Sequence, residues 1–107
     1  MIEIAANKAE QVALMARERE RAEPELRGFI EDMNEEEQAA LVAILWVGRG
    51  TFEPEEFAEA CATAFTERST PTADYLLATP NLAYDIEAGL EALGVDVTAT
   101  AEEVMGR

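Results

Sequence analysis

The sequence predicts an all-α protein, a compact single-domain bundle of about five helices around a buried central helix at about residues 35–48. Three observations support this fold class. Apolar residues recur at helical spacing in several segments, and capping residues or prolines precede those segments. Nine consecutive apolar residues, 39–47, also require a segment that is enclosed on nearly all sides. With 107 residues the chain is long enough for one domain, and we assign residues 1–107 to it.

The central helix has a recognisable beginning and end. Asn34 is a favourable N-cap, and Glu37 three residues later completes a capping box. Gly48 or Gly50 can adopt the left-handed conformation that ends a helix. A buried strand at 41–47 is the alternative, because a short apolar run is ambiguous by periodicity alone. The cap, the alanines and the glycine exit favour the helix, in which Trp46 is expected to be the central packing residue.

Two helices are predicted before the central one. Asn7 and Glu10 repeat the capping pattern, so an N-terminal helix is expected at about residues 8–21 with a thin apolar face. Its outer end, 17–21, is fully charged and is either solvated or paired with the acidic half of the chain. Pro24 suits the first turn of a second helix. The apolar face of that helix is Leu26, Phe29, Ile30 and Met33.

Three further helical segments are predicted after the central helix. Pro54 begins a helix that ends near Glu67. Its expected inward face is Phe57, Cys61, Ala64 and Phe65. A brief helical piece follows Pro71, and the next helix begins at Pro80 and ends at Gly94. Its apolar stripe is Leu82, Ile86, Leu90 and Leu93. A last helical turn at 101–105 belongs to a C-terminal tail, 98–107, that is expected to fray.

The charge of the chain limits its partners. Twenty-three acidic and eight basic residues give a formal charge of −15, which repels nucleic acid and anionic lipid. We therefore expect no direct nucleic-acid partner. The nine-residue apolar run is also too short to span a membrane, which takes about twenty residues. Between Gly50 and Gly106 there are twelve acids and one base, and this surface either attracts a basic partner or only keeps the protein solvated.

The residue inventory excludes several chemistries. The chain has no histidine and one cysteine, which removes histidine-activated nucleophiles, thiolate clusters and histidine-containing metal sites. Cys61 is expected to be a small buried hydrophobe. The turn around Gly50 resembles half of a calcium loop but lacks the first ligands. We therefore expect no catalytic residues, no cofactor, no metal and no enzyme activity. A secretion signal is not recognisable, so a cytoplasmic location is the default.

One short segment is a candidate contact site. Gly48 and Gly50 can turn the backbone and expose amides, while Arg49 between them can hold a carboxylate or phosphate. Tyr75 can add a hydroxyl in a groove or can simply pack at the edge of the core. The competing interpretation is a glycine-rich helix end in which Arg49 pairs with Glu53, Glu55 or the helix carbonyls.

Several of these segments together resemble a known family. They are the Asn-Glu-Glu-Glu-Gln helix start, Leu-Trp-Val-Gly-Arg-Gly after it, and Tyr-Leu-Leu-Ala-Thr-Pro further on. The chain is similar to a bacterial family known as domain of unknown function 3775, over a family-like core at residues 25–94. The resemblance implies a compact helical domain and brings no activity, ligand or site residue with it. Residues 1–22 lie outside it.

Three functions follow as expectations. The first is a small acidic protein-interaction module, with a homodimer as one form, because the apolar central helix needs more cover than short neighbours supply. The second is an acidic decoy or inhibitor that occupies a basic site on another protein. The third is a small-ligand binder or enzyme that uses Arg49.

Overall fold

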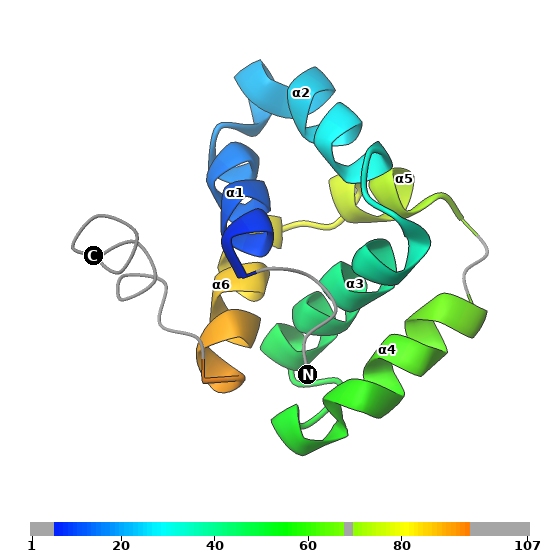
Figure 1. Ribbon diagram of the computed structural model, residues 1–107. Coiled ribbons are helices and arrows are strands. Elements are labelled where there is room, and N and C mark those ends of the chain that lie inside the picture. Colours follow the sequence, from blue (N-terminus) through cyan, green and yellow to red (C-terminus); the bar gives the residue numbers. More distant parts are fainter. Residues whose placement is uncertain (1–5, 68–69, 95–107) are drawn as a thin grey trace, which may run out of the picture.

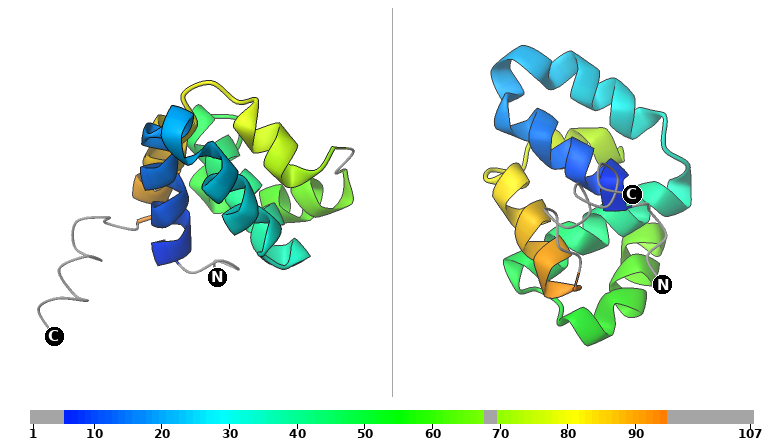
Figure 2. Two further views of the ribbon diagram at one scale, coloured as in Figure 1. Left: turned by 90° about the horizontal axis from the view of Figure 1, so that it is seen from above. Right: turned by 60° about the vertical axis from the view of Figure 1, so that its left-hand side comes forward.

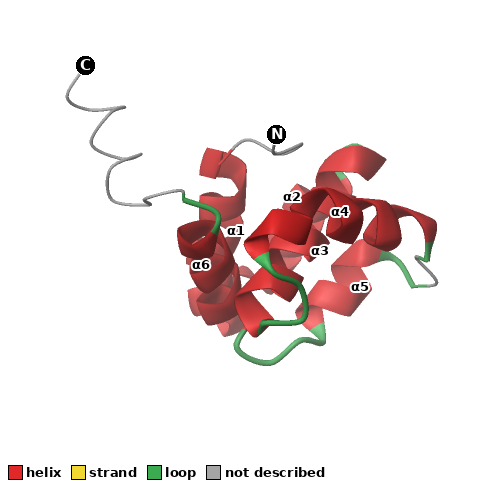
Figure 3. Cartoon of the chain, turned by 90° about the horizontal axis from the view of Figure 1, so that it is seen from below, coloured by secondary structure: helices red, strands yellow, loops and turns green. Residues whose placement is uncertain are grey.

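Six α-helices and one short 3-10 helix make up the regular structure of the described residues, 6–67 and 70–94 of the computed structural model (Figure 1). Among these residues none lies in a strand (Figure 3), so the all-α fold class is confirmed. The elements are α1 (Ala6–Arg17), α2 (Arg19–Glu31), α3 (Glu35–Arg49), η1 (Pro54–Glu56), α4 (Phe57–Thr66), α5 (Thr72–Leu77) and α6 (Leu82–Ala92). None of these described helices has the length and apolar content to cross a membrane.

Helix α3 is the centre of the fold, as the sequence predicts. It lies between α6 and α4 and also contacts α5 (Figures 1 and 2). Helix α1 packs on α6 and α2, and α2 packs on α5, so the outer helices close the bundle. The α3 residues that are buried are Ala39, Ala40, Leu41, Val42, Ala43, Ile44, Leu45 and Val47. The alternative of a buried strand in this segment is wrong.

Both ends of α3 have the predicted geometry. The Asn34 side chain accepts a hydrogen bond from the Glu37 amide at 2.7 Å, and the Glu37 carboxylate accepts one from the Asn34 amide at 3.1 Å. This capping box satisfies two amides that the first helical turn leaves without a partner. At the other end Gly50 has a φ of +83°, in the left-handed region. Its amide donates to the carbonyl of Val47, which closes the helix.

The predicted boundaries of the first two helices are wrong. Helix α1 begins at Ala6, so Asn7 lies inside it and is not its cap. The helix ends at Arg17 rather than at residue 21, because the chain turns where the Glu18 amide donates to the Met15 carbonyl. Helix α2 then begins at Arg19 and contains Pro24 at its sixth position. Good helix formers around this proline extend the helix ahead of it, although the proline itself cannot donate a backbone hydrogen bond.

Helix α4 is rotated relative to the prediction. Its buried residues are Phe57, Ala60 and Ala64, whereas Cys61 is only half-buried. Phe65, which was expected to face inward, is 40 % exposed. Small alanine side chains at 60 and 64 allow α4 to lie close to α3, and this close contact decides which face of α4 is covered.

Helix α6 agrees with its predicted stripe but begins later. It starts at Leu82, after Asn81 with a φ of +59°, and not at Pro80. Leu82, Ile86 and Leu90 are buried, and Leu93 packs against the core from its edge. Gly94, with a φ of +88°, follows the end of the helix as expected. The predicted tail at 98–107 and its turn at 101–105 lie outside the described residues.

Ion pairs connect the N-terminal helices to the acidic half of the chain. Arg17 at the end of α1 pairs with Glu87 of α6, and Arg27 of α2 pairs with Asp74 of α5. The sequence predicts that the charged end of the first helix is either solvated or paired with the acidic half of the chain. At Arg17 it is paired. Because exposed pairs of this kind typically stabilise a fold by less than about 1 kcal/mol, they orient the helices more than they hold them together.

Candidate functional site

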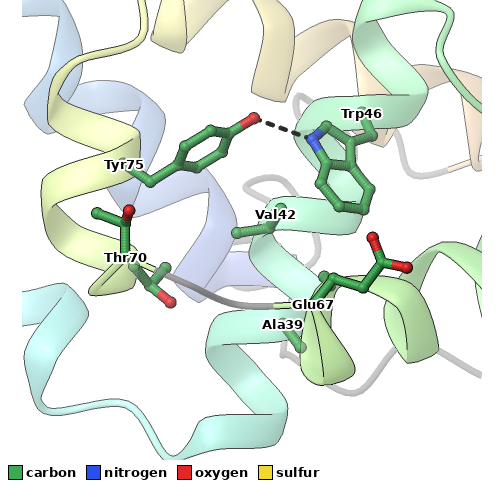
Figure 4. A pocket seen from close by; sticks show the side chains of 8 residues that line it. Ala39, Val42, Trp46, Glu67, Thr70 and Tyr75 are labelled. Carbon is green, nitrogen blue, oxygen red and sulfur yellow. Dashed lines mark hydrogen bonds between the residues drawn. The ribbon is translucent and has the colours of Figure 1, made fainter.

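A small pocket opens between α3, the end of α4 and the start of α5 (Figure 4). Its volume is about 130 Å³. The lining residues are Ala39, Val42, Trp46, Ala64, Glu67, Thr70, Thr72 and Tyr75. Apolar side chains from α3 and α4 form one part of this lining, while the polar groups come from the end of α4 and from α5 with the residues before it. Such a combination of apolar walls and a few placed polar groups is typical of a binding site.

Trp46 lies at the edge of this pocket and is not the buried centre of the core that the sequence predicted. It is half-buried, whereas leucine and isoleucine side chains fill the centre. Its indole stacks on Phe52, with ring centroids 5.6 Å apart and planes 24° apart. This stacking depends on Gly50, whose left-handed conformation turns the chain back so that the Thr51 amide donates to the Trp46 carbonyl at 2.9 Å. The turn after α3 therefore fixes the orientation of the indole.

The Tyr75 hydroxyl connects the pocket to the end of α3. The indole Nε1–H of Trp46 donates to the Tyr75 Oη at 3.0 Å (Figure 4), and Nη1 of Arg49 donates to the same oxygen at 3.3 Å. A tyrosine hydroxyl has two acceptor lone pairs and one donor hydrogen. Both lone pairs are used here, so the hydrogen of the Tyr75 hydroxyl is left to donate.

Arg49 differs from the other cations whose side chains the structure describes. Lys8, Arg17 and Arg27 each lie within salt-bridge distance of a carboxylate, whereas Arg49 forms no such pair with any described residue. The expected pairing of Arg49 with Glu53 or Glu55 is therefore not observed. Since the chain has nearly three acidic residues for each basic one, an arginine without a carboxylate partner is a distinctive feature of this surface.

The structure brings together two of the four residues that the sequence singled out. Arg49 and Tyr75 meet, although they lie 26 positions apart. Gly48 does not contribute an exposed amide, because it lies inside α3 where that helix contacts α6. Gly50 uses its amide to close the helix. The two glycines therefore position Arg49 and the indole, and they are not themselves a binding loop.

Sequence reasoning missed the remaining pocket residues. Trp46 lies in α3, Glu67 directly follows α4 and Thr72 begins α5. Only the packing of these helices makes the three residues neighbours. A signal was present at Trp46 alone, since the single tryptophan of the chain lies three residues before Arg49. Glu67 and Thr72 carried no signal, because exposed glutamates and helix-start threonines are common in such sequences.

A family model described as "Protein of unknown function (DUF3775)" matches residues 23–95, and the chain belongs to this family. The match includes every residue of the pocket as well as Arg49. Helix α1 lies outside it. No curated protein and no solved structure matches the chain.

Proposed function

We propose that this member of the DUF3775 family is a protein-interaction module that holds one side chain of a partner protein in the pocket between α3, α4 and α5. The size of the pocket carries the proposal. A cavity of roughly 150 Å³ accommodates a molecule such as benzene, and pockets for drug-sized ligands measure about 300–1,000 Å³. At about 130 Å³, this pocket has room for one apolar or aromatic side chain.

The chemistry of the lining supports the same function. Strong protein interfaces contain a few anchor side chains that enter a desolvated pocket, with polar groups around them. Here Val42, Ala39 and Ala64 provide apolar contact, and the Trp46 indole provides an aromatic wall. The hydroxyl of Tyr75 and the carboxylate of Glu67 supply polar groups around it. No chemical step is part of this proposal.

The partner is proposed to be a different protein and not a second copy. The expectation of a homodimer rested on incomplete cover of the central helix. In the structure a single chain covers α3, since all its apolar residues from 39 to 47 except Trp46 are buried. Trp46 itself contacts Phe52 and Tyr75 of the same chain. The original reason for self-association is therefore not met.

The test compares two alanine-to-leucine variants on the same helix. Ala64→Leu fills the pocket, whereas Ala62→Leu adds the same side chain on the exposed face of α4. Tagged wild type and both variants are purified from the native host at low salt, and the proteins that come with them are identified by mass spectrometry. We expect a stoichiometric partner that Ala62→Leu retains and Ala64→Leu loses, and binding of the purified partner is then measured by calorimetry.

Circular dichroism establishes that both variants are folded, and Ala39→Leu provides a second way to fill the pocket from α3. A partner that binds all three variants as well as it binds the wild type would contradict the pocket as the binding site.

An acidic decoy is the second candidate, and exposed glutamates favour it. The exposed glutamates are Glu53, which precedes η1, Glu55 and Glu56 of η1, and Glu59 in the first turn of α4. Such a surface attracts a basic protein over roughly a Debye length of 10 Å at 0.1 M salt. For a decoy we expect a basic partner that both leucine variants of α4 retain at low salt and that all forms release at moderate salt.

A further inference from the structure

The corner of the pocket at Tyr75 offers hydrogen-bond donors rather than acceptors. The Tyr75 oxygen already accepts from Trp46 and Arg49, so only its O–H remains available. A guanidinium has five N–H donors and no acceptor, and the contact with Tyr75 uses only one nitrogen of Arg49. The donors that remain at this corner therefore suit an acceptor, and the positive charge of Arg49 favours an anionic one.

A carboxylate fits these donors best. It presents two oxygen acceptors in one plane, and a guanidinium binds such a group through parallel N–H bonds. Among the four cations whose side chains the structure describes, Arg49 is also the one without a carboxylate partner. Its side chain is exposed, so a ligand can reach it without moving another charged group.

We propose that Arg49 and Tyr75 bind the C-terminal carboxylate of the partner protein, whose last side chain fills the pocket. This inference rests on the proposed function and specifies which part of the partner is bound. Tyr75 lines the pocket and its hydroxyl also contacts Arg49, so the pocket and the donor corner are adjacent. In a C-terminal residue the carboxylate and the side chain share one Cα, which matches this adjacency. In an internal aspartate the side chain itself is the carboxylate, so a second residue would have to fill the pocket.

Charge complementarity indicates which residues of the partner precede that C-terminal residue. The formal charge of −15 repels a purely anionic ligand, but basic residues upstream of the carboxylate reverse this effect. Glu67, which directly follows α4, lines the pocket on the side away from the Tyr75 helix (Figure 4). Glu53, in the turn after Arg49, is exposed. The ligand is therefore a terminus with an apolar last residue that follows basic residues.

The single tryptophan makes this proposal directly testable. In a ¹⁵N-labelled sample, one indole N–H signal reports on Trp46 at the pocket edge. The probes are N-acetylated tetrapeptides of the sequence Lys-Lys-Gly-X, in which X is valine, leucine or phenylalanine. Each is made as the free acid and as the carboxamide, and each is titrated at low salt. We expect the free acid of at least one peptide to shift the indole signal and to bind about tenfold more tightly than its carboxamide, or better.

Two arginine variants of equal charge change test the role of Arg49. Arg49→Gln is expected to remove the preference for the free acid. Arg17→Gln, which alters an exposed arginine of α1 that pairs with Glu87, is expected to leave it within about twofold. A peptide with an internal aspartate and an amidated end, Lys-Lys-Asp-Leu, is expected to bind no better than the other amides.

Three results would overturn the carboxylate site. They are equal binding of acids and amides, a preference that survives Arg49→Gln, and no indole shift with any free acid at millimolar concentration. These outcomes are separate from the test of the proposed function. If a partner is lost with Ala64→Leu while acids and amides bind alike, the interaction module stands and only the carboxylate site fails.

Discussion

Gly48 of α3 and Gly89 of α6 face each other where these two helices cross. A Cβ atom added to Gly48 would overlap the Asp85 carbonyl oxygen and would lie 2.8 Å from the Gly89 amide nitrogen. A Cβ atom added to Gly89 would overlap the carbonyl oxygen of Ile44. The backbones of α3 and α6 are therefore in direct contact, and the absence of two side chains makes this contact possible.

This crossing predicts that Gly48→Ala and Gly89→Ala are strongly destabilising. Each added methyl group meets backbone atoms that cannot rotate away, so the two helices must separate. We expect each change to lower the free energy of unfolding by about 3 kcal/mol or more, measured by urea denaturation. Gly28→Ala is the control, because nothing lies within 4 Å of the added Cβ on α2. For Gly28→Ala we expect the free energy of unfolding to rise by about 0.5–1 kcal/mol, because alanine has the higher helix propensity. A similar rise for Gly48→Ala would contradict the close crossing of α3 and α6.

Removal of the Tyr75 hydroxyl should affect both stability and the environment of Trp46. In Tyr75→Phe, the indole N–H and one Arg49 nitrogen lose their shared acceptor. We expect the free energy of unfolding to fall by about 1 kcal/mol and the indole N–H signal to shift in the NMR spectrum. Tyr84→Phe serves as the comparison, since the Tyr84 side chain is 70 % exposed and should tolerate the change. Unchanged indole signals in both variants would show that the hydroxyl is not bonded to Trp46.

The capping glutamate predicts a pH dependence of stability. The Lys8 ammonium, which donates to the Glu37 carboxylate at 2.7 Å, lowers the pKa of Glu37, and the Asn34 amide adds to this effect. A carboxyl group with a lowered pKa in the folded state stabilises the protein above its unfolded pKa of about 4.3, and this stabilisation is lost as the pH falls through the folded pKa. Glutamine can still accept the Asn34 hydrogen bond, so Glu37→Gln removes the charge and keeps the cap.

We expect Glu37→Gln to be less stable than the wild type by about 0.5–1 kcal/mol at neutral pH, with the difference closing below about pH 4. Urea denaturation from pH 3 to 7 measures this difference. Glu36→Gln, at the exposed neighbouring position, should differ less from the wild type in stability, and this difference should vary less with pH. If the Glu37→Gln difference grows as the pH falls, the lowered pKa of this carboxyl is wrong.

The cover of α3 by its own chain predicts a monomer in solution. Only a few large apolar side chains are exposed among the described residues, and they are Leu14, Phe65 and Tyr84. They lie on three different helices, α1, α4 and α6. Multi-angle light scattering should therefore give the mass of one chain across a wide concentration range. A stable dimer mass would instead support the homodimer that the apolar central helix first suggested.

Local sequence patterns determined the helical class and the limits of α3. The capping box at Asn34, the apolar run that follows it and the left-handed Gly50 act within a few residues, so they can be recognised without knowing the rest of the fold. The apolar stripe of α6 is local for the same reason. The family resemblance came from α3 and from the α5 segment that begins at Tyr75. At the N-terminus the local signals competed, and helix-forming residues ahead of Pro24 began α2 at Arg19, before the helix start that the proline suggested.

Tertiary packing alone decided the site. The Trp46–Tyr75 hydrogen bond joins residues 29 positions apart. Position 48 must be glycine because the backbone of α6, more than thirty residues later in the chain, packs directly against it. Periodicity gives the apolar face of each helix but not its partner, its rotation or its distance from that partner. For this reason the sequence placed Arg49 and Tyr75 among its candidates but assigned Trp46 to the core and Phe65 to the interior. The contact of α3 with α4 and α5 is what brought these separate residues together around one pocket.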